Sequence, residues 1–254
     1  MLQLKAVNSS VVEKYEIAAQ EAADYLVSQV GLDGYISAAK DYKWYKPHWF
    51  RDSSWVAISL LRYAAYLKGK GEEYSKYLDA ANRIIEFNLE ALEKYVPNLE
   101  RGLHIGLDGD EFFKLRNHIP ARVARSKNLY VDENINDFQQ YDVARSGLIQ
   151  YDTVPLILAS LYFKDRFFGL NPKEISFMKE RGRLVAEYLG KIFGTECASV
   201  WEIESNLLHA YDVGIIGFAF RTIEYFSEKY NLGITKQELE KIESTLYGGN
   251  PLAF

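Results

Sequence analysis

The sequence predicts an all-α fold, part of an α/α toroid-like barrel in which outer and inner helices alternate. Start and stop signals delimit seven helical segments, and these segments alternate between amphipathic and almost wholly apolar. A helix that is apolar all round must be covered on every side, whereas an amphipathic helix presents its polar face to water. The alternation therefore predicts helical hairpins with one outer and one inner member. A plain helical bundle is the alternative, and it does not require such alternation.

Capping residues, prolines and glycines set the limits of the segments. Capping boxes open the first and the last segment, at Ser10–Glu13 and Thr235–Glu238, and Asn171 precedes a helix that starts with Pro172. We expect helices over residues 10–31, 53–69, 72–95, 152–169, 171–194, 206–230 and 235–247. The stretch 97–144 lacks sustained periodicity, and loops of that length are usually functional or mobile.

The first, third and fifth segments carry charged faces, and the second, fourth and sixth do not. In the first segment, Glu16 belongs to the charged set. The apolar residues at helical spacing are Val11, Tyr15, Ala18, Ala22, Tyr25 and Leu26. The three predicted inner helices contain the apolar runs 56–61, 154–163 and 213–220. These inner helices are expected to form a ring around a funnel.

Composition and charge exclude several classes of protein. Hydrophobic residues make up 48% of the chain and charged residues 26%, which is too apolar for disorder, so we expect one helical domain over residues 1–254. The net charge is −5 and the basic residues are scattered, so no basic stripe predicts nucleic-acid binding. Apolar runs such as 154–163 are much shorter than the ~20 residues of a membrane span.

Cysteine and histidine are sparse. The single Cys197 allows no internal disulfide, and residues 1–10 contain no secretory signal, so we expect a cytoplasmic protein. The four histidines are spread along the chain, so we expect no metal site and no cofactor.

Polar and aromatic residues precede each predicted inner helix, and in a toroid they would converge at one end of the funnel. The three clusters are residues 45–52, residues 147–152, and residues 201–204 with His209 further on. Arg51 offers a planar donor fork and Asp52 two acceptor oxygens, a combination that suits neighbouring sugar hydroxyls. A tryptophan beside a glutamate, as at Trp201-Glu202, is typical of an acid whose pKa is raised, because the ring keeps water away from the ionised carboxylate.

Each of these residues also has a structural interpretation. Arg51 and Asp52 could form a salt bridge at a helix start, with Asp52 as the cap, and Asp152 could simply be an N-cap. Trp201 could be a core residue, and His209 a hydrogen-bonded structural histidine. It is their shared place before alternate helices that favours a binding site.

With these motifs the chain resembles glycoside hydrolase family 15, the family of glucoamylases, glucodextranases and related trehalases, whose catalytic domain is an (α/α)6 barrel. Four short segments carry the resemblance in the family's order. They are Gly31 to Gly34 followed by Tyr45-x-x-x-Trp49-x-Arg51-Asp52, then Gly147-x-x-Gln150-x-Asp152, then Trp201-Glu202, and finally Tyr247-Gly248-Gly249-Asn250-Pro251. The resemblance covers nearly the whole chain and corresponds to the N-terminal two thirds of the family's catalytic domain.

The resemblance implies roles for the motif residues. Glu202 corresponds to the general acid, and Arg51 and Asp52 to the residues that hold hydroxyls of the glucose at the non-reducing end. The complete implied substrate-binding set is Tyr45, Trp49, Arg51, Asp52, Gln150, Asp152, Trp201 and His209. The implied reaction is exo-hydrolysis of an α-glucosidic bond with inversion, which needs two carboxyl groups ~6.5–9.5 Å apart.

Two departures from the family pattern leave the function open. The family's general base is a Glu well beyond the fourth segment, and no residue up to Phe254 can be assigned to it; Glu204 stands where many relatives carry Arg. The chain is therefore expected to be either the front portion of an enzyme completed elsewhere, for example one chain of a split enzyme, or a non-catalytic sugar-binding or structural relative. The expected ligand is an α-glucoside or oligosaccharide of the malto-, isomalto- or trehalose type. We also expect self-association or a partner chain at the open edge of the barrel.

Overall fold

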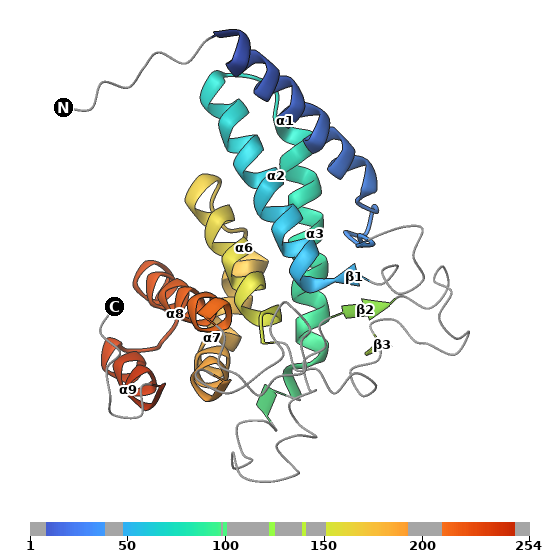
Figure 1. Cartoon of the computed structure of the whole chain (residues 1–254). Coiled ribbons are helices and arrows are strands. Elements are labelled where there is room, and N and C mark those ends of the chain that lie inside the picture. Colours follow the sequence, from blue (N-terminus) through green and yellow to red (C-terminus); the bar gives the residue numbers. More distant parts are fainter. Residues whose placement is uncertain are drawn as a thin grey trace, which may run out of the picture.

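The prediction of an all-α fold is confirmed. The computed structural model describes residues 9–38, 48–97, 99–100, 122–124, 139–140, 151–192 and 210–246, and most of these residues are helical. The helices are α1 (Ser9–Gln29), α2 (Phe50–Lys70), α3 (Ser75–Lys94), α6 (Thr153–Phe167), α7 (Pro172–Ile192), α8 (Ala210–Tyr230) and α9 (Lys236–Leu246) (Figure 1). No helix in the described ranges is long and apolar enough to cross a membrane.

Three very short strands form a small antiparallel sheet beside the helices. They are β1 (His48–Trp49), β2 (Arg122–Ala124) and β3 (Gln139–Gln140), in the order β1-β2-β3. His48 pairs with Val123, and β1 continues directly into α2. The sheet thus holds the chain at the point where α2 begins.

The helices that the sequence marks as apolar contact one another in succession. α2 packs against α3 and α6, and α6 packs in turn against α8. α1 lies along α2 and α3, while α7 contacts α8 and α9 (Figure 1). The helices α2, α6 and α8 therefore form a continuous row, flanked by the amphipathic helices.

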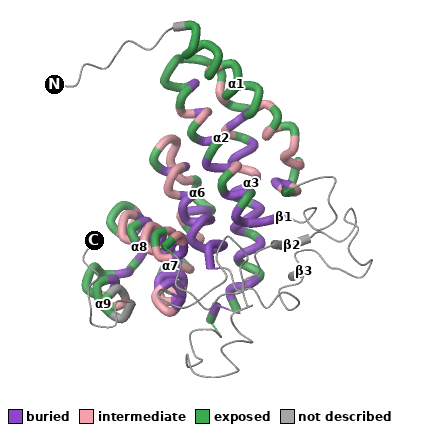
Figure 2. Tube along the Cα trace, in the orientation of Figure 1, coloured by how far each residue is buried: buried purple, intermediate pink, exposed green. Residues whose placement is uncertain are grey.

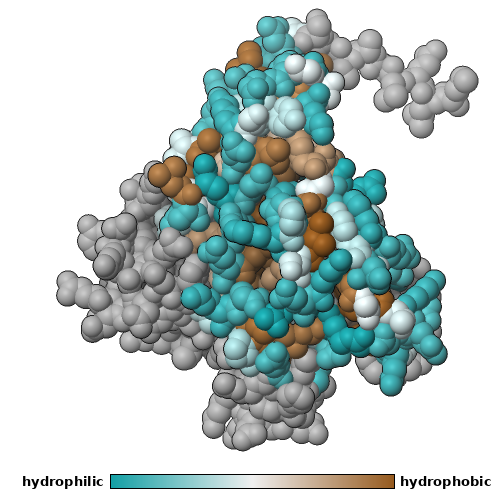
Figure 3. Space-filling model, turned by 180° about the vertical axis from the view of Figure 1, so that it is seen from behind, coloured by the Kyte–Doolittle hydropathy of each residue, from teal (hydrophilic) through white to brown (hydrophobic). Residues whose placement is uncertain are grey.

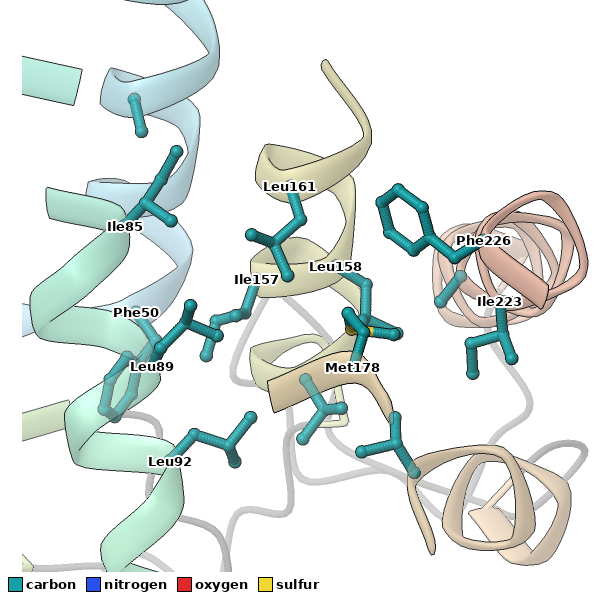
Figure 4. Close-up of a cluster of buried hydrophobic side chains, with 14 of the residues drawn as sticks. Phe50, Ile85, Leu89, Leu92, Ile157, Leu158, Leu161, Met178, Ile223 and Phe226 are labelled. Carbon is teal, nitrogen blue, oxygen red and sulfur yellow. The ribbon is translucent and has the colours of Figure 1, made fainter. Parts of the chain in front are cut away.

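One hydrophobic core runs through this row. Phe50 of α2 and Leu92 of α3 are almost completely buried, as are Ile157 of α6 and Phe226 of α8. Figure 4 shows these side chains between their helices, with Met178 of α7 closing the core from below α6. Burial of such side chains contributes about 1.5–3 kcal/mol each.

The predicted capping signals are largely correct. Thr235 and Glu238 form a reciprocal capping box, with the Glu238 amide donating to Thr235 Oγ1 at 3.2 Å and the Thr235 amide to Glu238 Oε2 at 2.8 Å. Asn171 caps α7 in the same reciprocal way with Glu174. Ser10 lies inside α1, because that helix already includes Ser9.

The predicted apolar face of α1 is mostly exposed, and of its residues Leu26 packs against the core. Tyr15 and Tyr25, which belong to the predicted apolar face, are 74% and 64% exposed, and Ala23 is the residue of α1 that the structure describes as buried. Much of α1 is coloured as exposed in Figure 2. Glu16, from the charged set, instead accepts a hydrogen bond from the hydroxyl of Tyr66 on α2. Ala23 is buried in the core, Leu26 and Val27 pack against it, and Glu16 and Asp24 bond to Tyr66 and Tyr77, so these residues lie on the side of α1 that faces α2 and α3.

The prediction that all three apolar helices are covered on every side is right for α6 alone. Residues Thr153–Leu161 of α6 are buried, whereas Trp55 of α2 is 45% exposed. On α8, Phe220 is buried, Phe218 is half-buried and Gly214 is exposed. Apolar side chains consequently reach the surface among hydrophilic ones, as the rear view shows (Figure 3).

Candidate functional site

The N-terminal ends of α2, α6 and α8 bring together a buried group of charged residues. Arg51 is the second residue of α2, Asp152 directly precedes α6, and Asp212 is the third residue of α8. All three are buried, with exposed fractions of 9%, 1% and 2%. Charged groups are rarely buried unless they are paired or functional, so this group is the strongest candidate site in the described chain.

Arg51 faces Asp152 across the contact between α2 and α6. Its Nη1 lies 3.5 Å from Asp152 Oδ2, and its guanidinium carbon lies 5.9 Å from the centre of the Trp49 ring. Asp52, the next residue along α2, is exposed at the same end of the helix. The ion pair of Arg51 with Asp152 therefore joins the start of α2 to the start of α6.

Asp152 does not cap α6 with its side chain. It occupies the N-cap position but makes no side-chain capping hydrogen bond. Burial raises the pKa of Asp152 from its ordinary value of 3.8 to about 6; Arg51 opposes this rise, while the carboxylates of Asp212 and Asp52 add to it. The simple capping role is thus absent, and the carboxyl group serves the charged cluster.

Asp212 is the site residue that no sequence motif predicted. Neither of its carboxylate oxygens has a hydrogen-bond partner among the described residues. Its charge acts on Asp152 and on Tyr211, which places it in the same cluster. The available signal was that Asp212 is the one charged residue in the stretch 210–220 of an apolar helix.

Aromatic side chains border the charged residues. Tyr211 is half-buried, and burial raises its pKa, with Asp152 and Asp212 adding to the rise while Arg51 opposes it. Trp55 lies one helical turn beyond Arg51 and is 45% exposed. An exposed indole beside buried carboxylates offers a flat apolar surface next to hydrogen-bond acceptors.

A buried polar network fixes the start of α2. His48 Nδ1 accepts a hydrogen bond from the Ile36 amide at 3.0 Å, so its Nε2 carries the proton and donates to Asn88 Oδ1 at 2.7 Å. Ser53 also donates to Asn88 Oδ1, at 3.3 Å. Phe87 packs against the histidine ring at 4.4 Å between centroids. This network ties the segment before α2 to α3 and so holds Trp49 and Arg51 in place.

The structure places only part of the predicted site. It brings Trp49, Arg51 and Asp152 together and leaves Asp52 exposed beside them. The remaining predicted residues lie outside the described residues: Tyr45, Gln150, Trp201, Glu202 and His209.

The described cluster combines buried carboxylates with one guanidinium. Within the described ranges no group of three or more His, Cys, Asp or Glu side chains could hold a metal ion. Carboxylates accept hydrogen bonds from hydroxyl groups, and a guanidinium donates to their oxygens. The cluster therefore combines the kinds of acceptor and donor that bind hydroxyl groups, with aromatic side chains beside them.

Comparison with known proteins supports the fold. No protein-family model matches the sequence, and comparison with curated proteins finds no match. Solved structures of glycosidases are similar: a wild-type glycosidase at a TM-score of 0.63 and 18% identity, and a glycosidase variant in complex with glucose at 0.65 and 17%. Both similarities cover 98% of this chain, which spans 60% of the length of those glycosidases. The chain thus has a helical fold that occurs in glycosidases.

Proposed function

We propose that this chain is a glycoside-hydrolase-like protein that binds an α-glucoside or oligosaccharide at the N-terminal ends of α2, α6 and α8. The observation that carries the proposal is the buried cluster of Arg51, Asp152 and Asp212, set in a fold that occurs in glycosidases. One of these glycosidases has glucose bound. Arg51 and Asp152 are also the residues that the family resemblance assigns to sugar contacts.

The row of α2, α6 and α8 is proposed as the inner wall of an α/α toroid. The helices contact one another in succession, and their N-terminal ends contribute the charged residues to one cluster. An arrangement of inner helices around a funnel would deliver such a cluster to a single opening. The amphipathic helices α1, α3, α7 and α9 would then form the outer layer.

Hydrolysis is the more specific part of the proposal. By resemblance, Glu202 would protonate the leaving oxygen, and a second carboxylate would activate water for inversion. Binding without turnover is the alternative, since no residue of this sequence is assigned as the base. The hydrolase and the non-catalytic sugar-binding protein would share the same sugar site and would differ only in whether the bound sugar is hydrolysed.

A binding experiment tests the common part. We expect glucose to bind the purified chain in calorimetry or ligand-observed NMR. Because Arg51 supplies the donors, Arg51→Met should lower the affinity at least tenfold. The matched control is Arg62→Met, an exposed arginine on the same helix, which should bind like the wild type. Wild-type protein that binds neither glucose nor an iminosugar analogue would refute the proposal.

An activity assay separates the two versions. The chain is incubated with maltose, isomaltose and trehalose, and released glucose is measured for wild type and Glu202→Gln. Turnover that disappears in Glu202→Gln supports the hydrolase. Sugar binding without turnover supports the non-catalytic alternative.

A further inference from the structure

Four carboxylates of the described chain are buried, those of Asp152, Asp165, Glu174 and Asp212. Asp152 faces the guanidinium of Arg51, and two others, Asp165 and Glu174, have hydrogen-bond partners. Asp165 of α6 accepts hydrogen bonds from the Tyr225 hydroxyl and from Lys229 Nζ, both at 2.7 Å, and from the hydroxyl of Tyr230. Glu174 pairs with Lys164 at 2.5 Å and accepts a hydrogen bond from the Asn171 amide. These partners offset the cost of removing the charge from water.

Asp212 differs from both. It is 2% exposed, and neither carboxylate oxygen meets a donor from the described residues. The guanidinium of Arg51 faces Asp152, so part of its positive charge already stabilises the Asp152 carboxylate. The position of Asp212 in the first turn of α8 lets the positive end of the helix dipole offset only a small part of the cost.

A carboxylate that is buried without donors is costly for the free protein, and proteins retain such groups mainly at functional sites. The missing partners are donors, and among the described residues the cluster around Asp212 carries more negative than positive charge. Asp52, Asp152 and Asp212 act together with one guanidinium, that of Arg51. A ligand that fits this balance brings hydroxyl or ammonium donors and no negative charge.

We propose that Asp212 is a substrate-binding residue whose carboxylate accepts hydrogen bonds from hydroxyls of the bound sugar, and that it restricts the site to neutral or cationic sugars. This inference rests on the sugar site proposed above and adds to it a contact and a selection rule. Sugar acids and sugar phosphates would place a second anion beside Asp212 and Asp152. Glucose and glucosamine would supply the donors that the carboxylate lacks.

The free protein and the complex should respond in opposite directions to Asp212→Asn. The amide keeps the size of the side chain and removes the unpaired charge, so the urea midpoint of the free protein should rise. The same change replaces one charged acceptor by a donor, so glucose affinity should fall at least tenfold, which corresponds to about 1.4 kcal/mol. An asparagine at a merely structural position would not lower the affinity.

Asp165→Asn is the matched control, because Asp165 is a buried carboxylate at the contact of the same two helices. It should lower the urea midpoint, since its tyrosine and lysine donors lose a charged acceptor, and leave the glucose affinity of the folded protein unchanged. Asp212→Ser serves as a second variant of the site if Asp212→Asn does not fold. It too should weaken glucose binding.

A ligand series completes the test. Wild-type protein should bind glucose and glucosamine at least tenfold more tightly than glucuronate and glucose 6-phosphate, and Asp212→Asn should reduce that ratio. If wild type binds glucose and Asp212→Asn or Asp212→Ser binds it equally well, the inference is overturned while the proposed function stands. If wild type binds no sugar, the proposed function and this inference fail together.

Discussion

The raised pKa of Asp152 makes a quantitative prediction about stability and pH. The folded protein holds the proton of this carboxyl group up to a pKa of about 6, against an ordinary value of 3.8. Between these values the folded state binds more protons than the unfolded state, so stability falls as the pH rises. At about 1.4 kcal/mol per pKa unit, the loss attributable to Asp152 between pH 4 and pH 7 is about 2–3 kcal/mol.

Asp152→Asn isolates this contribution. The amide does not titrate, keeps the shape of the side chain, and leaves Arg51, Asp52 and Asp212 around it unchanged. We expect the free energy of unfolding of the wild type to fall by about 2–3 kcal/mol more than that of Asp152→Asn over this pH range.

The assay is urea unfolding of both proteins at pH 4, 5, 6 and 7, followed by circular dichroism. Titration of groups that do not interact with Asp152 affects the two proteins alike and cancels in the difference between the two curves. Parallel curves, within about 0.5 kcal/mol across the range, would show that Asp152 is not the buried acid described here.

Three further predictions concern stability and assembly. Asp165→Asn should lower the free energy of unfolding by about 1.5–3 kcal/mol, the usual value for hydrogen bonds to a charged group, as measured by urea unfolding at pH 7. Gly34→Ala should cost more than about 1 kcal/mol, because Gly34 has a φ of 86° and an added Cβ would lie 2.0 Å from the Arg83 carbonyl oxygen; Gly69→Ala, inside α2 with nothing within 4 Å, should instead gain about 0.5–1 kcal/mol in the same experiment. The exposed apolar residues of α1 should promote association, so Tyr15→Glu should lower the mass measured by light scattering; an unchanged monomer in both proteins would contradict this.

Local signals explain why the helices were predictable. A capping box such as Thr235 with Glu238, or a proline such as Pro172 at the first helical position, acts within four residues of the chain. The continuous apolar run at the start of α6 likewise predicts its burial without reference to any partner. Such information is contained in a short stretch of sequence, and it carries over to the structure.

The candidate site was only partly predictable, because its contacts join helices that are far apart in the sequence. The motif before α2 pointed to Arg51, but it suggested Asp52 as the partner, whereas the structure pairs Arg51 with Asp152. The hydrogen bond between His48 and Asn88 joins the start of α2 to α3, and no local sequence pattern predicts it. Asp212 was missed because a single acidic residue in an apolar helix has no meaning until its surroundings are known.

The sequence by itself determined the helical class, most helix limits and the helix ends at which polar residues gather. The tertiary structure decided which side of α1 faces the core and which carboxylates surround Arg51. The physical reason is one of range. Capping and helix periodicity depend on neighbours within one or two turns, while burial and charge pairing depend on how whole helices pack against one another.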